Sequence, residues 1–143
     1  MIAVDTNLLV YALREDSPFH ASAVEVLTDL ASSGKRWAIP WPCIHEFISI
    51  STHPKIYRPP TPLQTACEAA KVWLDSPYCE GLAEGPGYWD VLTSLARKAK
   101  LAGPMIHDAR IAALCLHHGV AELWTADRDF SRFPTLVTRN PLV

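Results

Sequence analysis

Short apolar runs along the chain alternate with longer stretches in which apolar residues recur at helical spacing. The runs predict buried strands, because a strand that is covered on both faces is apolar throughout. We expect strands at residues 2–4, 37–39, 78–83, 120–125 and 136–137. The periodic stretches predict helices at residues 8–14, 17–31, from 42 onward, 62–75, 86–101 and 106–118. This alternation predicts an α/β fold of three layers, α/β/α, with helices on both faces of a central parallel sheet of four to five strands.

Local signals set the expected ends of several helices. Asp5 or Thr6 can cap the first helix, and Gly119 can end the last one. The segment Thr61-Pro62-Leu63-Gln64 has the form of a capping box with proline at the first helical position. Residues 54–62 hold four of the twelve prolines, which predicts a stiff surface loop.

The helical periods also predict which side chains face inward. Val24 falls on the buried stripe of the helix at residues 17–31, and Trp89 on that of the helix at residues 86–101. The five tryptophans could stack on nucleobases, but their positions favour packing in the core. Trp41, which lies between two prolines, is the exception.

Composition and charge narrow the function classes. The 143 residues are expected to form one domain spanning residues 1–143. With a net charge of −2, nucleic acid can bind only through a local basic patch or through metal ions. The four cysteines include no C-x-x-C pair, which excludes a zinc ribbon or a thioredoxin-type site. We expect a cytoplasmic protein with reduced thiols, without signal peptide or membrane association.

Four acidic residues should meet at one edge of the predicted sheet. Asp5 ends the first strand, and Glu46 lies one turn into the helix after the second strand. Asp108 begins the buried helix at residues 106–118, and Asp127 follows the strand at residues 120–125. Because strands of a parallel sheet end at the same edge, where the following helices begin, these carboxylates are expected to converge there.

Converging carboxylates repel one another unless a positive charge lies between them. A hard divalent cation, Mg²⁺ or Mn²⁺, prefers oxygen ligands and would neutralise such a site towards a phosphodiester. Asp5 and Asp108 also stand where helix caps stand, so spacing alone leaves capping and metal binding both open. Glu46, in an otherwise apolar stretch, is harder to explain as a cap.

Three motifs and an isolated Glu46 carry a resemblance to a known family. The motifs are Val4-Asp5-Thr6-Asn7, Ile106-His107-Asp108-Ala109 and Thr125-Ala126-Asp127-Arg128-Asp129-Phe130. In this order they resemble the PIN-domain ribonucleases. The C-terminal part, which closes with Asn140-Pro141-Leu142, is similar to the VapC toxins of bacterial toxin–antitoxin pairs. The similarity covers essentially the whole chain, and the order of the motifs is more specific than any one of them.

The resemblance implies a Mg²⁺- or Mn²⁺-dependent endoribonuclease that a cognate VapB-type antitoxin holds inactive. By the same resemblance, Asp5, Glu46, Asp108 and Asp127 match the family's acidic quartet, which holds the metal and carries catalysis. Asp129 matches a further acid that is less regularly a direct ligand, so the resemblance leaves open whether it contacts the metal or supports the site from a second layer.

Other polar residues are expected to assist this site. Thr6, Asn7 and Thr125 match small polar positions that orient carboxylates or waters. Three arginines flank the acidic edge and could contact RNA phosphates; they are Arg110, Arg128 and Arg132. The apolar N-terminal helices could cover a partner surface, which makes a homodimer plausible.

Rival functions differ at single residues. His45-Glu46 begins like the zinc-binding motif H-E-x-x-H of the zincin metalloproteases. The motif is incomplete, because Ser49 stands where its second histidine should be. An aspartyl-phosphate phosphohydrolase needs an aspartate two positions after Asp5, where the chain has Asn7, and a downstream lysine, whereas no lysine follows Lys100. The remaining alternative is a non-catalytic PIN-like module that binds RNA or acts as a scaffold without metal.

Overall fold

The computed structural model describes all 143 residues and consists of a five-stranded sheet with six α-helices. In chain order the elements are β1 (Ile2–Val4), α1 (Thr6–Leu13), α2 (His20–Ser32), β2 (Trp37–Pro40), α3 (Trp41–Ser51), α4 (Leu63–Leu74), β3 (Cys79–Leu82), α5 (Tyr88–Lys98), the 3₁₀ turn η1 (Gly103–Met105), α6 (Ile106–His117), β4 (Glu122–Trp124), η2 (Arg128–Arg132) and β5 (Thr138–Arg139). The predicted α/β alternation is confirmed.

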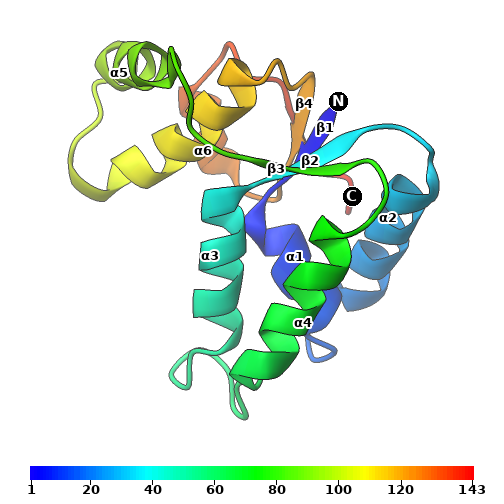
Figure 1. Cartoon of the computed structure of the whole chain (residues 1–143). Helices are drawn as coiled ribbons and strands as arrows, with labels where there is room; N and C mark the ends of the chain where they lie inside the picture. Colours follow the sequence, from blue (N-terminus) through cyan, green and yellow to red (C-terminus); the bar gives the residue numbers. More distant parts are fainter.

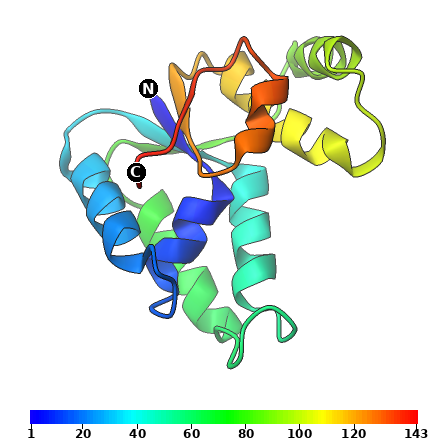
Figure 2. The same cartoon turned by 180° about the vertical axis from the view of Figure 1, so that it is seen from behind.

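The order of the strands explains the three layers. All neighbouring strands are parallel, in the order β3-β2-β1-β4-β5. The chain moves from β1 to β2 to β3 in one direction and then returns across the sheet to β4. Because crossovers between parallel strands are right-handed, this reversal moves the later helices to the opposite face. Figures 1 and 2 show α1 to α4 on one side of the sheet and α5 and α6 on the other.

The direction in which successive strands are added to the sheet reverses between the neighbouring strands β1 and β4. Such a position is called a topological switch point. Ala3 and Val4 of β1 are fully buried, as expected of a strand covered on both faces. Pairing of β1 with β4 brings Val4 level with Trp124, and the Asp5 amide donates to the Trp124 carbonyl (3.0 Å). Residues that follow the two strands therefore leave the sheet side by side, where ligands bind in open α/β sheets.

The predicted start of the second helix and the predicted capping box are wrong. The second helix begins at His20 rather than at Ser17, because the Ser17 hydroxyl accepts the Phe19 amide (3.1 Å) and closes a turn first. Its Val24 is 39% exposed rather than buried. The capping box at residues 61–64 does not form: Pro62 is the N-cap of α4 and no side chain bonds there, while the Thr61 hydroxyl accepts from Arg14 (3.3 Å).

The predicted inward position of Trp89 is also wrong, since its side chain is 69% exposed. Gly87, in the left-handed conformation (φ 91°), is the N-cap of α5, and the buried stripe of the helix runs through Tyr88, Leu92 and Leu95. Trp89 lies one position away from that stripe, about 100° around the helix.

The last strand pairs two residues later than predicted, at Thr138–Arg139. The Leu136 amide is used in a turn, where it donates to the Phe133 carbonyl (2.9 Å), and the Leu136 side chain enters the core. Pairing with β4 begins only when the Val137 carbonyl accepts the Leu123 amide (2.9 Å). No helix in the structure has the length and apolar character that crossing a bilayer requires.

Candidate active site

Asp5 lies at the centre of the sheet edge and is 4% exposed. It is the N-cap of α1, where Oδ1 accepts the Thr6 amide (2.7 Å). Oδ2 accepts the Thr125 hydroxyl (2.7 Å), and the Cys43 thiol donates to Oδ1 (3.4 Å). Asp5 therefore caps a helix and also lines the cavity at this edge, so its capping role does not exclude metal binding.

Burial raises the pKa of Asp5 to about 6, although the hydrogen bonds from Thr125 and Thr6 act in the opposite direction. The nearby charge of Glu46 raises it further. A carboxylate with such a pKa is costly to keep ionised in the absence of a positive charge. The electrostatics thus favour a cation next to Asp5.

Glu46 reaches the same edge from α3. It is half-buried on a helix whose Ile44 and Phe47 are buried, and its Oε2 accepts the Thr6 hydroxyl (2.9 Å). Thr6 consequently connects Asp5 through its amide and Glu46 through its hydroxyl. Its side chain is well placed to orient a carboxylate.

Asn7 and Thr125 hold the loop after β4 against the start of α1. The Asn7 side-chain amide donates to the Thr125 hydroxyl oxygen (3.4 Å), and Asn7 Oδ1 accepts the Ala126 amide (3.2 Å). The Thr125 oxygen also accepts the Asp127 amide (3.0 Å). This network fixes the position of Asp127 relative to Asp5.

Three aspartates form the tightest acidic cluster. Asp108, in the first turn of α6, and Asp127 and Asp129, at the start of η2, each offer an oxygen within 4.8 Å of the others. Asp127 Oδ1 accepts the Asp129 amide (2.8 Å), which binds the last two acids to each other. Asp129, for which the resemblance left both a ligand role and a supporting role open, belongs to this cluster, whereas Asp5 and Glu46 lie outside the tight group.

The charges around Asp108 conflict. Its pKa is raised, first by partial burial and then by the carboxylates of Asp127 and Asp129. Arg132 acts in the opposite direction. The Arg132 guanidinium lies 3.7 Å from Asp108 and 3.9 Å from Asp129. One arginine therefore offsets part of the charge of the three aspartates.

A cavity of about 300 Å³ joins the four predicted acids. Asp5, Glu46, Asp108 and Asp127 all line it. The rest of its lining consists of the polar Thr6 and Asn7 and of Val10, Tyr11, Ile50, Tyr57, Ile111 and Phe130. The aromatic part was missed in the sequence, because Tyr57 lies in the proline-rich loop, where no periodic pattern marks an inward position.

The predicted RNA-contact arginines have three different environments. Arg110 lines a polar groove of about 430 Å³ that shares Glu46 with the acidic cavity, and its buried Nε has no hydrogen-bond partner. Arg132 pairs with the aspartates, and Arg128 is exposed on η2. Only Arg110 combines an unpaired buried donor with a groove that adjoins the site.

The donor set fits a hard divalent cation. All candidate ligands are carboxylate oxygens, and no thiol or imidazole belongs to the cluster at Asp108, Asp127 and Asp129. Burial raises the pKa of both Asp5 and Asp108, and a cation beside them would favour their ionised forms. Asp108, Asp127 and Asp129 could therefore hold the cation, with Asp5 and Glu46 on the same cavity.

Comparisons with known proteins give a consistent result. The PIN domain profile matches residues 2–136. Ribonuclease VapC43 of Mycobacterium tuberculosis is 34% identical over 142 residues, which cover 99% of this chain and 96% of that protein. Ribonuclease VapC48 of the same species is 32% identical over 138 residues, 96% of this chain and 94% of that protein.

Solved structures share the fold at low sequence identity. VapBC-1 from nontypeable Haemophilus influenzae superposes with a TM-score of 0.69 and 18% identity, covering 100% of both chains. VapC20 of M. tuberculosis, described as a sarcin–ricin loop cleaving toxin, gives a TM-score of 0.63 and 19% identity, covering 92% of this chain and 93% of that chain. The three-layer architecture is thus shared with these toxins.

Proposed function

Because the chain belongs to the PIN-domain family and matches VapC ribonucleases over nearly its whole length, we propose that it is a metal-dependent endoribonuclease toxin controlled by an antitoxin. The observation that carries the proposal is the convergence of Asp5, Glu46, Asp108 and Asp127 on one cavity. These acids come from four separate segments, and their mutual repulsion has no structural benefit in a protein without a cation.

Mg²⁺ or Mn²⁺ is the proposed cofactor. When bound, the cation would supply positive charge to a phosphodiester and Lewis-acid activation to a water molecule. Asp108, Asp127 and Asp129 would hold it, since their oxygens are already close together. Asp5 and Glu46, which line the same cavity as Asp108 and Asp127, would complete the acidic site.

The residues around these acids keep the site in place. Thr125 orients Asp5 through its hydroxyl and Asp127 through the amide that it accepts. Thr6 orients Glu46. A rigid arrangement of this kind lowers the cost of bringing a phosphodiester and a water molecule into line. Hydrolysis then breaks one phosphorus–oxygen bond of the RNA backbone.

Arginines would compensate for the negative charge of the substrate. Arg110 in the adjoining groove, Arg128 on η2 and Arg132 beside the aspartates are the proposed phosphate contacts. Since the chain carries a net charge of −2, these local cations and the metal must provide the attraction for RNA.

We also propose a VapB-type antitoxin and a second copy of the chain as partners. The solved relatives include VapBC toxin–antitoxin complexes. Exposed Val24 on α2 and Val72 on α4 border a groove of about 460 Å³ between these helices, which offers an apolar surface for protein contacts. Light scattering of the chain, alone and with its antitoxin, tests both assemblies. Because RNA is the proposed substrate, we place the protein in the cytoplasm.

The alternative is a PIN-like module that binds RNA or serves as a scaffold without cutting. A module that does not bind metal would gain nothing from four acidic residues that line one cavity. RNA cleavage by the purified chain separates the two functions. We expect cleavage with Mn²⁺ or Mg²⁺, its loss in EDTA and its return when the metal is restored. RNA binding without cleavage under all these conditions would favour the non-catalytic module.

A further inference from the structure

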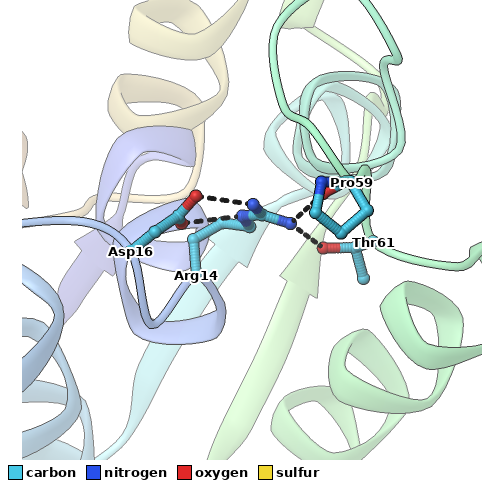
Figure 3. A network of polar contacts seen from close by, with 4 residues as sticks. All are labelled: Arg14, Asp16, Pro59 and Thr61. Carbon is cyan, nitrogen blue, oxygen red and sulfur yellow. Dashed lines mark hydrogen bonds and ion pairs between the residues drawn. The ribbon is translucent and has the colours of Figure 1, made fainter.

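Arg14 ties the proline-rich loop between α3 and α4 to the end of α1 (Figure 3). Its Nε and Nη2 donate to the two carboxylate oxygens of Asp16 (3.0 and 2.6 Å). Its Nη1 donates to the Pro59 carbonyl (2.9 Å) and to the Thr61 hydroxyl (3.3 Å). The Arg14 side chain is only 11% exposed, in contrast to ordinary surface ion pairs.

The same guanidinium also lies over an aromatic ring of this loop. The Arg14 Cζ atom is 4.2 Å from the centre of the Tyr57 ring, which is within the range of a cation–π contact. Tyr57 is consequently held half-buried, whereas its neighbour Ile56 is 53% exposed. Arg14 therefore fixes both the backbone of the loop and the ring that it carries.

Tyr57 lines the cavity of the acids, together with Tyr11 and Ile50. The cavity is thus lined by two chemically different kinds of side chain, carboxylates on the one hand and aromatic and aliphatic groups on the other. A nucleotide has two corresponding parts, a phosphate, which the carboxylates would bind through the proposed cation, and a base with flat apolar faces. Since Arg14 covers one face of the Tyr57 ring, a ligand can contact only the other face or the edge of the ring.

We propose that Tyr57 is a specificity-determining residue that packs against a nucleobase flanking the scissile phosphate, and that Arg14 is its positioning residue. The inference rests on the proposed ribonuclease function and deepens it. A base can lie against Tyr57 only when it has left its own stack, so the site selects RNA that is unpaired at the cleavage position.

The test uses two RNA oligonucleotides of one sequence, the second with an abasic residue beside the scissile phosphate. We expect removal of the base to lower kcat/KM of the wild-type chain by about ten- to a hundredfold, the usual strength of a base–aromatic contact. Tyr57→Phe, which keeps the ring, should behave in the same way. Tyr57→Ala should cleave the intact RNA as slowly as the wild type cleaves the abasic RNA, and should not distinguish the two substrates.

Two further variants separate this role from a structural one. Arg14→Gln should lose part of the sensitivity to the base, because the ring is no longer held. Ile56→Ala, on the same loop but outside the cavity, should keep the full sensitivity. A variant that is merely less stable would lose activity on both substrates in equal proportion and would keep their ratio.

Three outcomes would overturn the inference. If Tyr57→Ala keeps the wild-type ratio between intact and abasic RNA, the base does not pack on Tyr57. If the wild type cleaves the same sequence inside a duplex as fast as in a single strand, the site does not require an unpaired base. If the wild-type chain cleaves no RNA at all with Mn²⁺, the proposed function itself fails and the inference with it.

Discussion

The Thr125 hydroxyl donates a 2.7 Å hydrogen bond to Asp5 Oδ2, and this contact joins the ends of β1 and β4 at the base of the acidic cavity. The same oxygen accepts the Asp127 amide (3.0 Å). One threonine thereby sets the distance between two acids that are 122 positions apart in the sequence. Thr125 and Asp5 are both buried, so the loss of this hydrogen bond would be costly.

Replacing Thr125 by valine, which has nearly the same shape, tests this role. Thr125→Val leaves Asp5 Oδ2 without its hydroxyl donor, and a buried polar atom that loses its partner costs about 1–3 kcal/mol. We expect a corresponding loss in the free energy of unfolding and a reduced rate of RNA cleavage. Thr125→Ser keeps the hydroxyl and serves as the matched control. Equal stability of the valine and wild-type chains in urea would contradict the role.

The raised pKa of Asp5 predicts a stability that depends on pH. Because the folded-state pKa, about 6, lies above the ordinary value of 3.8, folding favours the protonated acid. The contribution of Asp5 to the free energy of unfolding is therefore fully present below pH 3.8 and is lost as the pH rises through about 6. Asp5→Asn does not titrate, so without metal its stability relative to the wild type should increase by about 2–3 kcal/mol over this interval.

Thermal unfolding in EDTA over a series of pH values measures this difference. The gap in Tm between Asp5→Asn and the wild type should shift in favour of the variant as the pH rises. A difference in Tm that stays constant with pH would mean that burial does not raise the pKa of Asp5. Asp90→Asn, at an exposed position on α5 that does not line the cavity, is the matched control for this substitution.

Metal binding should stabilise the fold, because the folded chain holds the acids together and the unfolded chain does not. At a Mn²⁺ concentration about a hundredfold above Kd, the expected gain is about 2.7 kcal/mol. Asp108→Asn removes a member of the tight cluster and should weaken or abolish the saturable rise in Tm, whereas Asp90→Asn should preserve it. An unchanged titration curve for Asp108→Asn would place the cation elsewhere.

The architecture follows from the sequence because buried parallel strands and amphipathic helices leave strong periodic signals. The hydrophobic periodicity could not predict individual side-chain hydrogen bonds that change where a helix begins or how it is capped. Ser17 closes a turn that delays α2 to His20, and Thr61 bonds Arg14 instead of capping α4. Trp89 lies beside the buried stripe of α5 because tertiary packing buries the face that carries Tyr88, Leu92 and Leu95.

The acidic edge could be anticipated for a topological reason, since strands of a parallel sheet end together and carry their following residues to one place. The exact positions of side chains at this edge depend on the conformations of the loops, which the spacing of residues in the sequence does not reveal. The Asp129 amide bonds Asp127, and this bond brings the Asp129 carboxylate into the cluster. Tyr57 could not be foreseen either, because only the folded contact with Arg14 brings it to the cavity.

The most direct test of the central claim is cleavage of RNA by purified Asp5→Asn and Asp108→Asn in the presence of Mn²⁺, with circular dichroism to show that each variant is folded. If the converged carboxylates carry catalysis, both folded variants lose at least about a hundredfold in rate, as removal of an essential site residue commonly does. Undiminished metal-dependent cleavage by both would show that the acidic cavity is not the active site.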